Sequence, residues 1–119
     1  MLRPMLRSKI HRAVLTRKDL SYHGSITLHS ELMAAAGIVA GEFVQVVNIN
    51  SGARLFTYVI EGDEPGQICL NGGAARLGEV GDLLIVMSIG LVDDAGAAGW
   101  TSRVVEMSPD NTVAEIREA

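Results

Sequence analysis

The sequence predicts a small, mainly β domain with short helices. Its apolar segments are short, and glycine interrupts them often, with 13 glycines in 119 residues; this pattern is typical of strands joined by turns. Hydrophobic residues make up 48% of the chain but aromatic residues only 4%, so the core must consist of Val, Ile, Leu, Met and Ala. A chain of this length has the usual size of one domain and can bury a core without disulfide bonds.

The expected strands are apolar or β-branched segments bounded by turn residues. They span residues 5–16, 43–49, 55–60, 67–70, 83–88 and 101–107. A brief helix over 32–36 fits between Ser30 as N-cap and Gly37 as C-terminal cap, and 74–77 has room for one helical turn.

Turn signals and composition indicate how these segments connect. Asn50-Ser51-Gly52 predicts a hairpin between the second and third strands. The segment 83–88 is the most apolar and is expected at the centre of the sheet, 92–99 is loop-like, and 101–107 is expected at an edge. We expect a single β-barrel domain over residues 1–107 and a flexible tail over 108–119. Within this tail, residues 113–118 have the composition of a loose helix.

One segment of the chain resembles another. Residues 35–46 and 75–86 each run from small residues through a Gly-acid pair into an apolar strand. Two such copies fit a small barrel with pseudo-twofold symmetry, which removes sheet edges by closure. The alternative is that both segments are ordinary junctions between a turn and a strand.

Charge and cysteine content restrict the classes of function. The formal net charge is −4, so we expect no nucleic-acid partner. No apolar run reaches the roughly 18 residues that span a bilayer, and the N-terminus lacks the apolar stretch of a secretory signal. These features predict a cytoplasmic protein with no membrane partner. The single Cys69 excludes an internal disulfide and a cysteine zinc cluster, and it fits a reducing compartment.

The N-terminal segment concentrates positive charge. Six bases and no acids precede Asp19: Arg3, Arg7, Lys9, Arg12, Arg17 and Lys18. Such a segment can serve small anions, carboxylates in particular. We therefore expect an anionic small molecule as the ligand.

The most informative peptide is Gly24-Ser25. A serine hydroxyl that follows glycine can attack the glycine carbonyl and exchange the amide for an ester. Loss of the serine α-proton then breaks the ester, and hydrolysis of the resulting enamine leaves a pyruvoyl group at position 25. Because glycine has no Cβ, Gly24 tolerates a strained conformation that exposes its carbonyl. Gly-Ser is also common in turns, so the surrounding residues must decide between a cleavage site and an ordinary turn.

Strand alternation groups further candidates. Lys9 and His11 share one face of the first strand. Arg54 and Tyr58 share a face of another, with Thr57 on the opposite face if that strand is regular. These side chains offer cations and hydroxyl groups to one ligand.

With these motifs the chain resembles the aspartate 1-decarboxylase family of pyruvoyl enzymes. The matching residues occur in family order: Met5-Leu6, Lys9-Ile10-His11-Arg12, Asp19-Leu20, Tyr22, Gly24-Ser25, Ala35-Ala36-Gly37-Ile38, Gly52, Arg54, Thr57-Tyr58, Asn71-Gly72 and Val80-Gly81-Asp82. The resemblance implies a double-psi β-barrel and a homotetramer with sites between subunits. It implies decarboxylation of L-aspartate to β-alanine and CO2 for pantothenate biosynthesis.

The resemblance also implies a role for each residue near the cleavage site. Gly24 and Ser25 form the cleaved peptide, which gives fragments 1–24 and 25–119, and Ser25 becomes a pyruvoyl group that forms a Schiff base with the substrate. Thr57 assists processing and Tyr58 is the proton donor. The pyruvoyl group is the only cofactor expected, without metal or pyridoxal phosphate.

The remaining implied residues bind substrate. They are Lys9, Tyr22, Arg54, Asn71, Gly72, Gly73 and Ala74. The guanidinium group of Arg54 can hold a carboxylate by two parallel hydrogen bonds, which lysine cannot copy. Which cation meets which carboxylate stays open at this point. Val47, Phe56 and Gly73 depart from the family pattern and leave selectivity against glutamate open.

Two alternative functions remain. The chain is either a small β-barrel that binds a ligand or partner without self-cleavage, or a pyruvoyl decarboxylase for another amino acid. The sequence does not fix whether a helper protein assists maturation.

Overall fold

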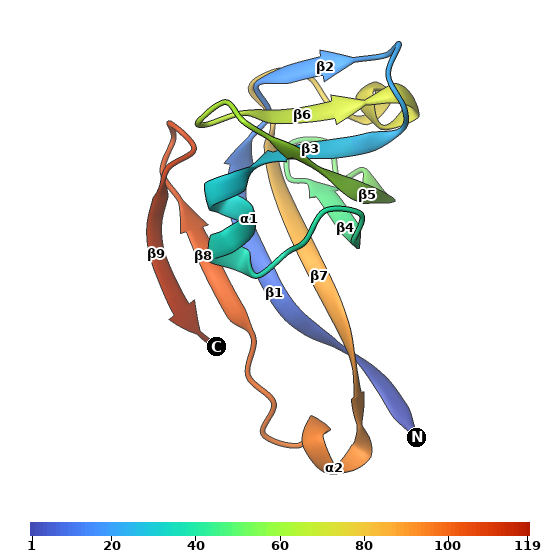
Figure 1. Ribbon diagram of the computed structural model, residues 1–119, viewed down its shortest axis with the longest axis vertical. Helices are drawn as coiled ribbons and strands as arrows, with labels where there is room; N and C mark the ends of the chain where they lie inside the picture. The colour runs from blue at the N-terminus through green and yellow to red at the C-terminus, as the bar shows by residue number, and fades with distance from the viewer.

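The computed structural model describes all residues 1–119 and consists mainly of strands (Figure 1). The strands are β1 (Leu2–Val14), β2 (Arg17–Asp19), β3 (Ser25–His29), β4 (Phe43–Asn48), β5 (Arg54–Gly62), β6 (Ile68–Asn71), β7 (Leu83–Asp93), β8 (Arg103–Met107) and β9 (Val113–Glu118). The helical segments are α1 (Ser30–Ala36), the 3-10 helix η1 (Gly72–Leu77) and α2 (Asp94–Ala97). The predicted class, mainly β with short helices, is confirmed. None of the helices has the length and apolar character needed to cross a membrane.

All strands belong to one sheet of mixed direction. Its order is β2-β6-β3-β5-β4-β7-β1-β8-β9. The pairs β1/β8, β2/β6 and β3/β5 are parallel, so they need crossover connections rather than hairpins. This topology differs from an up-and-down barrel and agrees with the predicted double-psi β-barrel. In Figure 1, β1 and β7 lie side by side and antiparallel, with the start of β1 and the end of β7 at the end of the molecule that carries α2.

The core lies on one face of this curved sheet. Ile10, Val86 and Val46 are paired across β1, β7 and β4, and each is 0% exposed. Fully burying one such aliphatic side chain contributes about 1.5–3 kcal/mol. Because side chains alternate along a strand, the neighbouring residues of these strands point away from the core. We call that opposite side of β6, β3, β5, β4, β7 and β1 the outer face.

The two similar segments have the same local structure. Gly41 and Gly81 both have positive φ, at 85° and 98°. The carboxylate of the next residue then accepts a hydrogen bond from the backbone N–H three residues earlier, for Glu42 from Val39 and for Asp82 from Glu79. Each turn leads into an apolar strand, β4 or β7. The resemblance therefore extends to the hydrogen bonds, as the predicted pseudo-twofold symmetry requires.

The first helix begins at a different cap from the predicted one. Gly37 ends α1 in a left-handed conformation, with φ of 68°, as predicted. The N-cap, however, is His29 and not Ser30. The His29 Nδ1 accepts a hydrogen bond from the Leu32 backbone N–H at 3.2 Å, so the imidazole takes the place that a serine hydroxyl usually fills.

The C-terminal third corrects three predictions. β7 extends to Asp93 and is followed by α2, so 92–99 is not a simple loop. β8 is not an edge strand, because it pairs with both β1 and β9. Residues 113–118 form a strand and not a loose helix, since β8 would otherwise expose unpaired backbone groups. All six residues of β9 are exposed, and the flexibility of the tail stays a prediction.

Candidate active site

The predicted cleavage peptide lies at the entrance to β3. Ser25 is the first residue of this strand and is fully buried, at 0% exposure. β3 lies between β5 and β6, and Ser25 pairs with Asn71 of β6. The Ser25 hydroxyl donates a hydrogen bond to the His23 carbonyl at 2.8 Å. The serine oxygen is thus held beside the backbone that precedes it.

Asn71 connects Ser25 to its surroundings. Its Nδ2 donates to Ser25 Oγ and to Thr27 Oγ1, both at 2.9 Å. Its Oδ1 accepts a hydrogen bond from the Cys69 thiol at 3.1 Å. Asn71 is only 3% exposed, so these bonds satisfy a buried amide, which would otherwise be costly. The sequence prediction that Asn71 belongs to the site is supported by direct contact with Ser25.

Gly72 makes close approach to the cleavage peptide possible. Its φ is 60°, and an added Cβ would lie 2.6 Å from the Gly24 nitrogen and 2.8 Å from the Tyr22 carbonyl oxygen. Only glycine fits that space. The adjacent Gly73 has open space around it, while Ala74 is buried in the core. Of residues 72–74, Gly72 is thus the one that lies directly against Gly24.

Thr57 and Tyr58 lie on the neighbouring strand β5. β3 and β5 pair in parallel with Ile26 opposite Val59. Continuing that register by one residue brings Ser25, the first residue of β3, level with Tyr58, and Thr57 directly precedes Tyr58 on β5. Thr57 is buried, whereas Tyr58 is half-buried. Their alternating burial confirms that they occupy opposite faces of the strand.

Arg54 and Lys9 lie on the outer face but on different strands. The pairings of β1, β7, β4 and β5 align Lys9 with Met87, Gln45 and Phe56. Arg54 is two residues from Phe56 and therefore shares its face. Neither cation forms a salt bridge.

Lys9 and Ser25 lie on strands that do not pair with each other. In the order of the sheet, β5, β4 and β7 lie between β3, which begins at Ser25, and β1, which carries Lys9. The structure thus brings Asn71, Gly72 and Ser25 together, while Lys9 lies on a strand that does not pair with β3. His11, which we expected beside Lys9, has a buried Nδ1 without a hydrogen-bond partner.

A cavity of about 170 Å³ adjoins Asn71 and Thr27 on the outer face. Eight residues line it: Arg17, Asp19, Tyr22, Thr27, Ile60, Gln67, Cys69 and Asn71. Of these, only Tyr22 and Asn71 were predicted. Thr27 lies two residues after Ser25 on β3, and Cys69 lies two residues before Asn71 on β6. Because alternate residues of a strand share a face, the predicted residues Ser25 and Asn71 indicate Thr27 and Cys69. Burial raises the pKa of the Cys69 thiol, and the positive charge of Arg17 partly offsets this.

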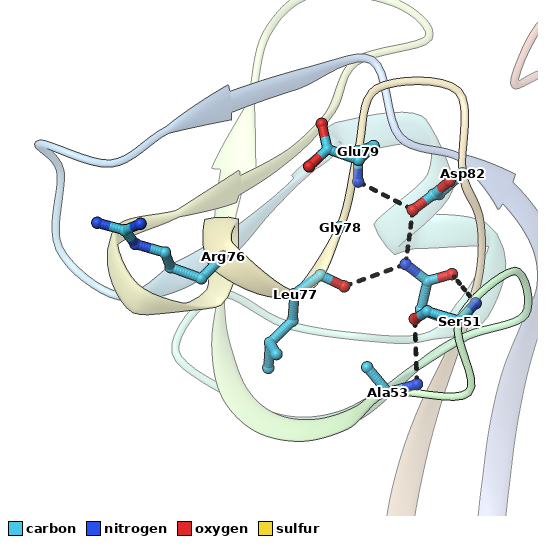
Figure 2. Close-up of a pocket in the computed structure, with 8 residues that line it drawn as sticks. Ser51, Ala53, Arg76, Leu77, Gly78, Glu79 and Asp82 are labelled. Carbon is cyan, nitrogen blue, oxygen red and sulfur yellow. Dashed lines mark hydrogen bonds between the residues drawn. The ribbon is translucent and has the colours of Figure 1, made fainter.

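A second pocket, of about 300 Å³, lies away from Ser25 at the turns that precede β5 and β7 (Figure 2). Asp82 accepts hydrogen bonds there from the Asn48 side chain and the Glu79 backbone, which lower the pKa of the Asp82 carboxyl. In Figure 2, Arg76 extends away from this cluster. Because the polar groups bond to one another, we assign these contacts to turn stabilisation.

The fold and site define a class: a small, mainly β protein with a Gly-Ser peptide whose buried serine is held by an asparagine from the adjacent strand. Comparison with known proteins identifies the family within that class. The aspartate decarboxylase family model matches residues 1–114, and the chain belongs to this family.

Individual relatives agree over nearly the whole chain. The chain is 50% identical over 117 residues to the aspartate 1-decarboxylase of Clostridium beijerinckii, covering 98% of this chain and 94% of the relative. It is 48% identical over 112 residues to that of Thermoanaerobacter pseudethanolicus, covering 93% and 96%. It is 49% identical over 117 residues to that of Corynebacterium efficiens, covering 98% and 86%.

Among solved structures, a computationally designed protein named msDPBB_sym2 has a TM-score of 0.49 and 21% identity, covering 63% of this chain and 96% of the designed one.

Proposed function

We propose that this chain is a self-processing carboxy-lyase that converts L-aspartate to β-alanine and CO2, supplying β-alanine for pantothenate biosynthesis in the cytoplasm. Membership of the aspartate decarboxylase family supports the reaction. The single structural observation that carries the proposal is the buried Ser25 hydroxyl, held by Asn71 next to Gly24.

Maturation begins at the peptide bond between Gly24 and Ser25. Ser25 Oγ attacks the Gly24 carbonyl carbon, the C–N bond breaks, and an ester with a free Ser25 amino group results. Removal of the Ser25 α-proton expels Gly24 as a carboxylate through cleavage of the Cβ–Oγ bond. Water then replaces the nitrogen at residue 25, which leaves as ammonia. One water is consumed, and the products are fragments 1–24 and 25–119.

The first step creates negative charge on the Gly24 carbonyl oxygen. A donor aimed at this oxygen typically accelerates such a step by about 10²–10³-fold. Thr57 is the candidate donor, because it is a buried hydroxyl residue on β5, the strand that pairs in parallel with β3. We assign Thr57 to processing on this basis and on the family resemblance.

The surroundings of residue 25 fit a pyruvoyl group. The N–H that Asn71 directs at Ser25 suits a carbonyl oxygen as well as a hydroxyl, and Gly72 keeps the space beside residue 24 free of side-chain atoms. When present, this group supplies an electron sink next to the substrate α-carbon.

Two cations suit a substrate with two carboxylates. Arg54 binds one carboxylate through its guanidinium group, and Lys9 provides the second positive charge. Tyr22 and Asn71 orient the reacting end, together with the backbone of 72–74. Tyr58 donates the proton that replaces the departing carboxylate at the α-carbon.

The separation of Lys9 from Ser25 supports sites shared between chains. In a homotetramer, Lys9 of one subunit can reach Ser25 of another. The outer face also carries Phe43 and Phe56, which are 70% and 62% exposed. An apolar surface of this kind favours contact with a second copy of the chain.

The test is decarboxylation by purified protein. We expect release of CO2 and β-alanine from L-aspartate, with little release from L-glutamate or L-alanine. The Ser25→Ala variant should remain one chain and release no CO2. Decarboxylation of aspartate by Ser25→Ala would overturn the proposal, and preference for glutamate or alanine would overturn the substrate assignment.

A further inference from the structure

We infer that Cys69 and Thr27 are positioning residues that fix the orientation of the Asn71 carboxamide, so that one of its N–H groups faces residue 25 before and after cleavage. This inference rests on the proposed self-cleavage. It concerns two residues to which the family resemblance assigned no role.

The hydrogen bonds around Asn71 define its orientation. A carboxamide has one acceptor end and one donor end, and rotation by 180° exchanges them. Here the Cys69 thiol donates to Oδ1 at 3.1 Å, while Nδ2 donates to Ser25 Oγ and Thr27 Oγ1 at 2.9 Å each. After rotation, the amide NH₂ would face the thiol sulfur, which is a weak acceptor. The thiol therefore favours the orientation that directs N–H at Ser25.

The donor end of Asn71 has two hydrogens with different fates during maturation. One bonds to Ser25 Oγ, and this oxygen departs with Gly24 when the Cβ–Oγ bond breaks. The other bonds to Thr27 Oγ1, which no step of cleavage alters. Thr27 therefore retains the amide after Ser25 has lost its hydroxyl, and the freed N–H remains available to the new carbonyl oxygen at residue 25.

Strand geometry explains why these side chains meet. Thr27 lies opposite Cys69 in the antiparallel pair of β3 and β6, and Ser25 lies opposite Asn71. All four side chains consequently point to the outer face. Cys69 is 3% exposed, so water does not compete readily for its hydrogen bond. Thr27, Cys69 and Asn71 also line the 170 Å³ cavity, so their orientation defines its wall.

The test compares variants that remove a hydrogen-bonding group with variants that retain it. Cys69→Ala loses the donor and Cys69→Ser keeps one. Thr27→Val loses the acceptor and Thr27→Ser keeps it. Cleavage is followed as the fraction of intact chain against time by mass spectrometry, and turnover is measured per reactive carbonyl in the cleaved fraction.

We expect Cys69→Ala and Thr27→Val to cleave about five- to tenfold more slowly than wild type, as loss of one buried hydrogen bond suggests, with recovery in both serine variants. Thr27→Val should also lower turnover of the cleaved enzyme. If Cys69→Ala and Thr27→Val both cleave at the wild-type rate, the inference is overturned. It is also overturned if Cys69→Ala and Cys69→Ser are slowed equally. If the wild-type chain itself stays intact, the proposed function fails instead.

Discussion

At the scale of single residues, the site depends on how closely the chain approaches itself. Gly72 lies against Gly24 with no room for a side chain. Its positive φ adds a second reason for glycine, since a residue with Cβ is strained there. The geometry of the cleavage site therefore depends on the absence of a Cβ at Gly72 as well as on the groups that contact Ser25.

Gly72→Ala tests this contact. The added methyl group must displace Gly24 or Tyr22, so we expect self-cleavage to slow by more than tenfold and the melting temperature to fall. Gly73→Ala is the matched control, because nothing lies within 4 Å of the Cβ that it would add. Equal cleavage rates in both variants, measured by intact mass over time, would contradict this account of Gly72.

At the scale of elements, side-chain hydrogen bonds tie distant strands together. Asn111 is 2% exposed with φ of 62°. Its Oδ1 accepts from the Val14 N–H at 2.7 Å, and its Nδ2 donates to the carbonyls of Val14 and Gly66 at 2.8 and 2.9 Å. Because Val14 belongs to fragment 1–24, Asn111 connects the two predicted fragments.

Asn111→Ala should lower the free energy of unfolding by about 2–4 kcal/mol, since three buried hydrogen bonds are lost. Denaturant unfolding in the Ser25→Ala background measures this on an intact chain. Asn111→Gly, which also lacks the side chain but adopts positive φ freely, should lose less. An Asn111→Ala protein as stable as its parent would show that these bonds contribute nothing.

The ion pair between Arg7 and Glu42 links β1 to the turn before β4. Burial alone raises the pKa of the Glu42 carboxyl, but hydrogen bonds from Ser88, Arg7 and the Val39 backbone lower it below its ordinary value of 4.5. A carboxyl with a depressed pKa stabilises the fold above the unfolded-state pKa, and this contribution is lost as pH falls through the folded-state pKa.

Glu42→Gln should therefore destabilise the protein near neutral pH, and its deficit should shrink once pH falls below about 4.5. Unfolding free energies of both proteins, measured in the Ser25→Ala background between about pH 7 and pH 3, check the trend. A deficit that stays constant across this range would exclude ionised Glu42 as its cause.

Six of the nine strands were predictable from sequence, whereas β2, β3 and β9 were missed and the strand partners were not predicted. Glycine turns delimit β4, β5 and β7, and these strands were found. β9 was missed because residues 113–118 include Ala114 and two glutamates, which also suit helices. Pairing with β8 decides their conformation. Similarly, Ser25 and Asn71 were found from motifs, whereas Thr27 and Cys69 matter only because two distant strands pair.

At the scale of the whole molecule, the candidate residues lie on strands that do not all pair with one another. Ser25 and Asn71 lie on adjacent strands, but Lys9 is four strands from Ser25 along the sheet. Fragment 1–24 contributes β1 and β2, which pair with β7, β8 and β6. These pairings are expected to hold the fragments together after cleavage.

Mixing two inactive variants tests whether sites are shared between chains. Lys9→Ala keeps Ser25, and Ser25→Ala keeps Lys9. If a site combines these residues from different subunits, coexpression in equal amounts should restore about a quarter of wild-type activity through random assembly. Activity no higher than that of either variant alone would indicate that each site belongs to one chain.

The most direct measurement is the intact mass of purified, active protein before and after treatment with borohydride. Two species are expected, with masses of residues 1–24 and of 25–119 starting from a pyruvoyl group. Only the larger species should gain mass, from the hydrogen that reduction adds to its carbonyl group, and the treated protein should lose activity. A single chain of 119 residues that decarboxylates aspartate and resists borohydride would contradict the account.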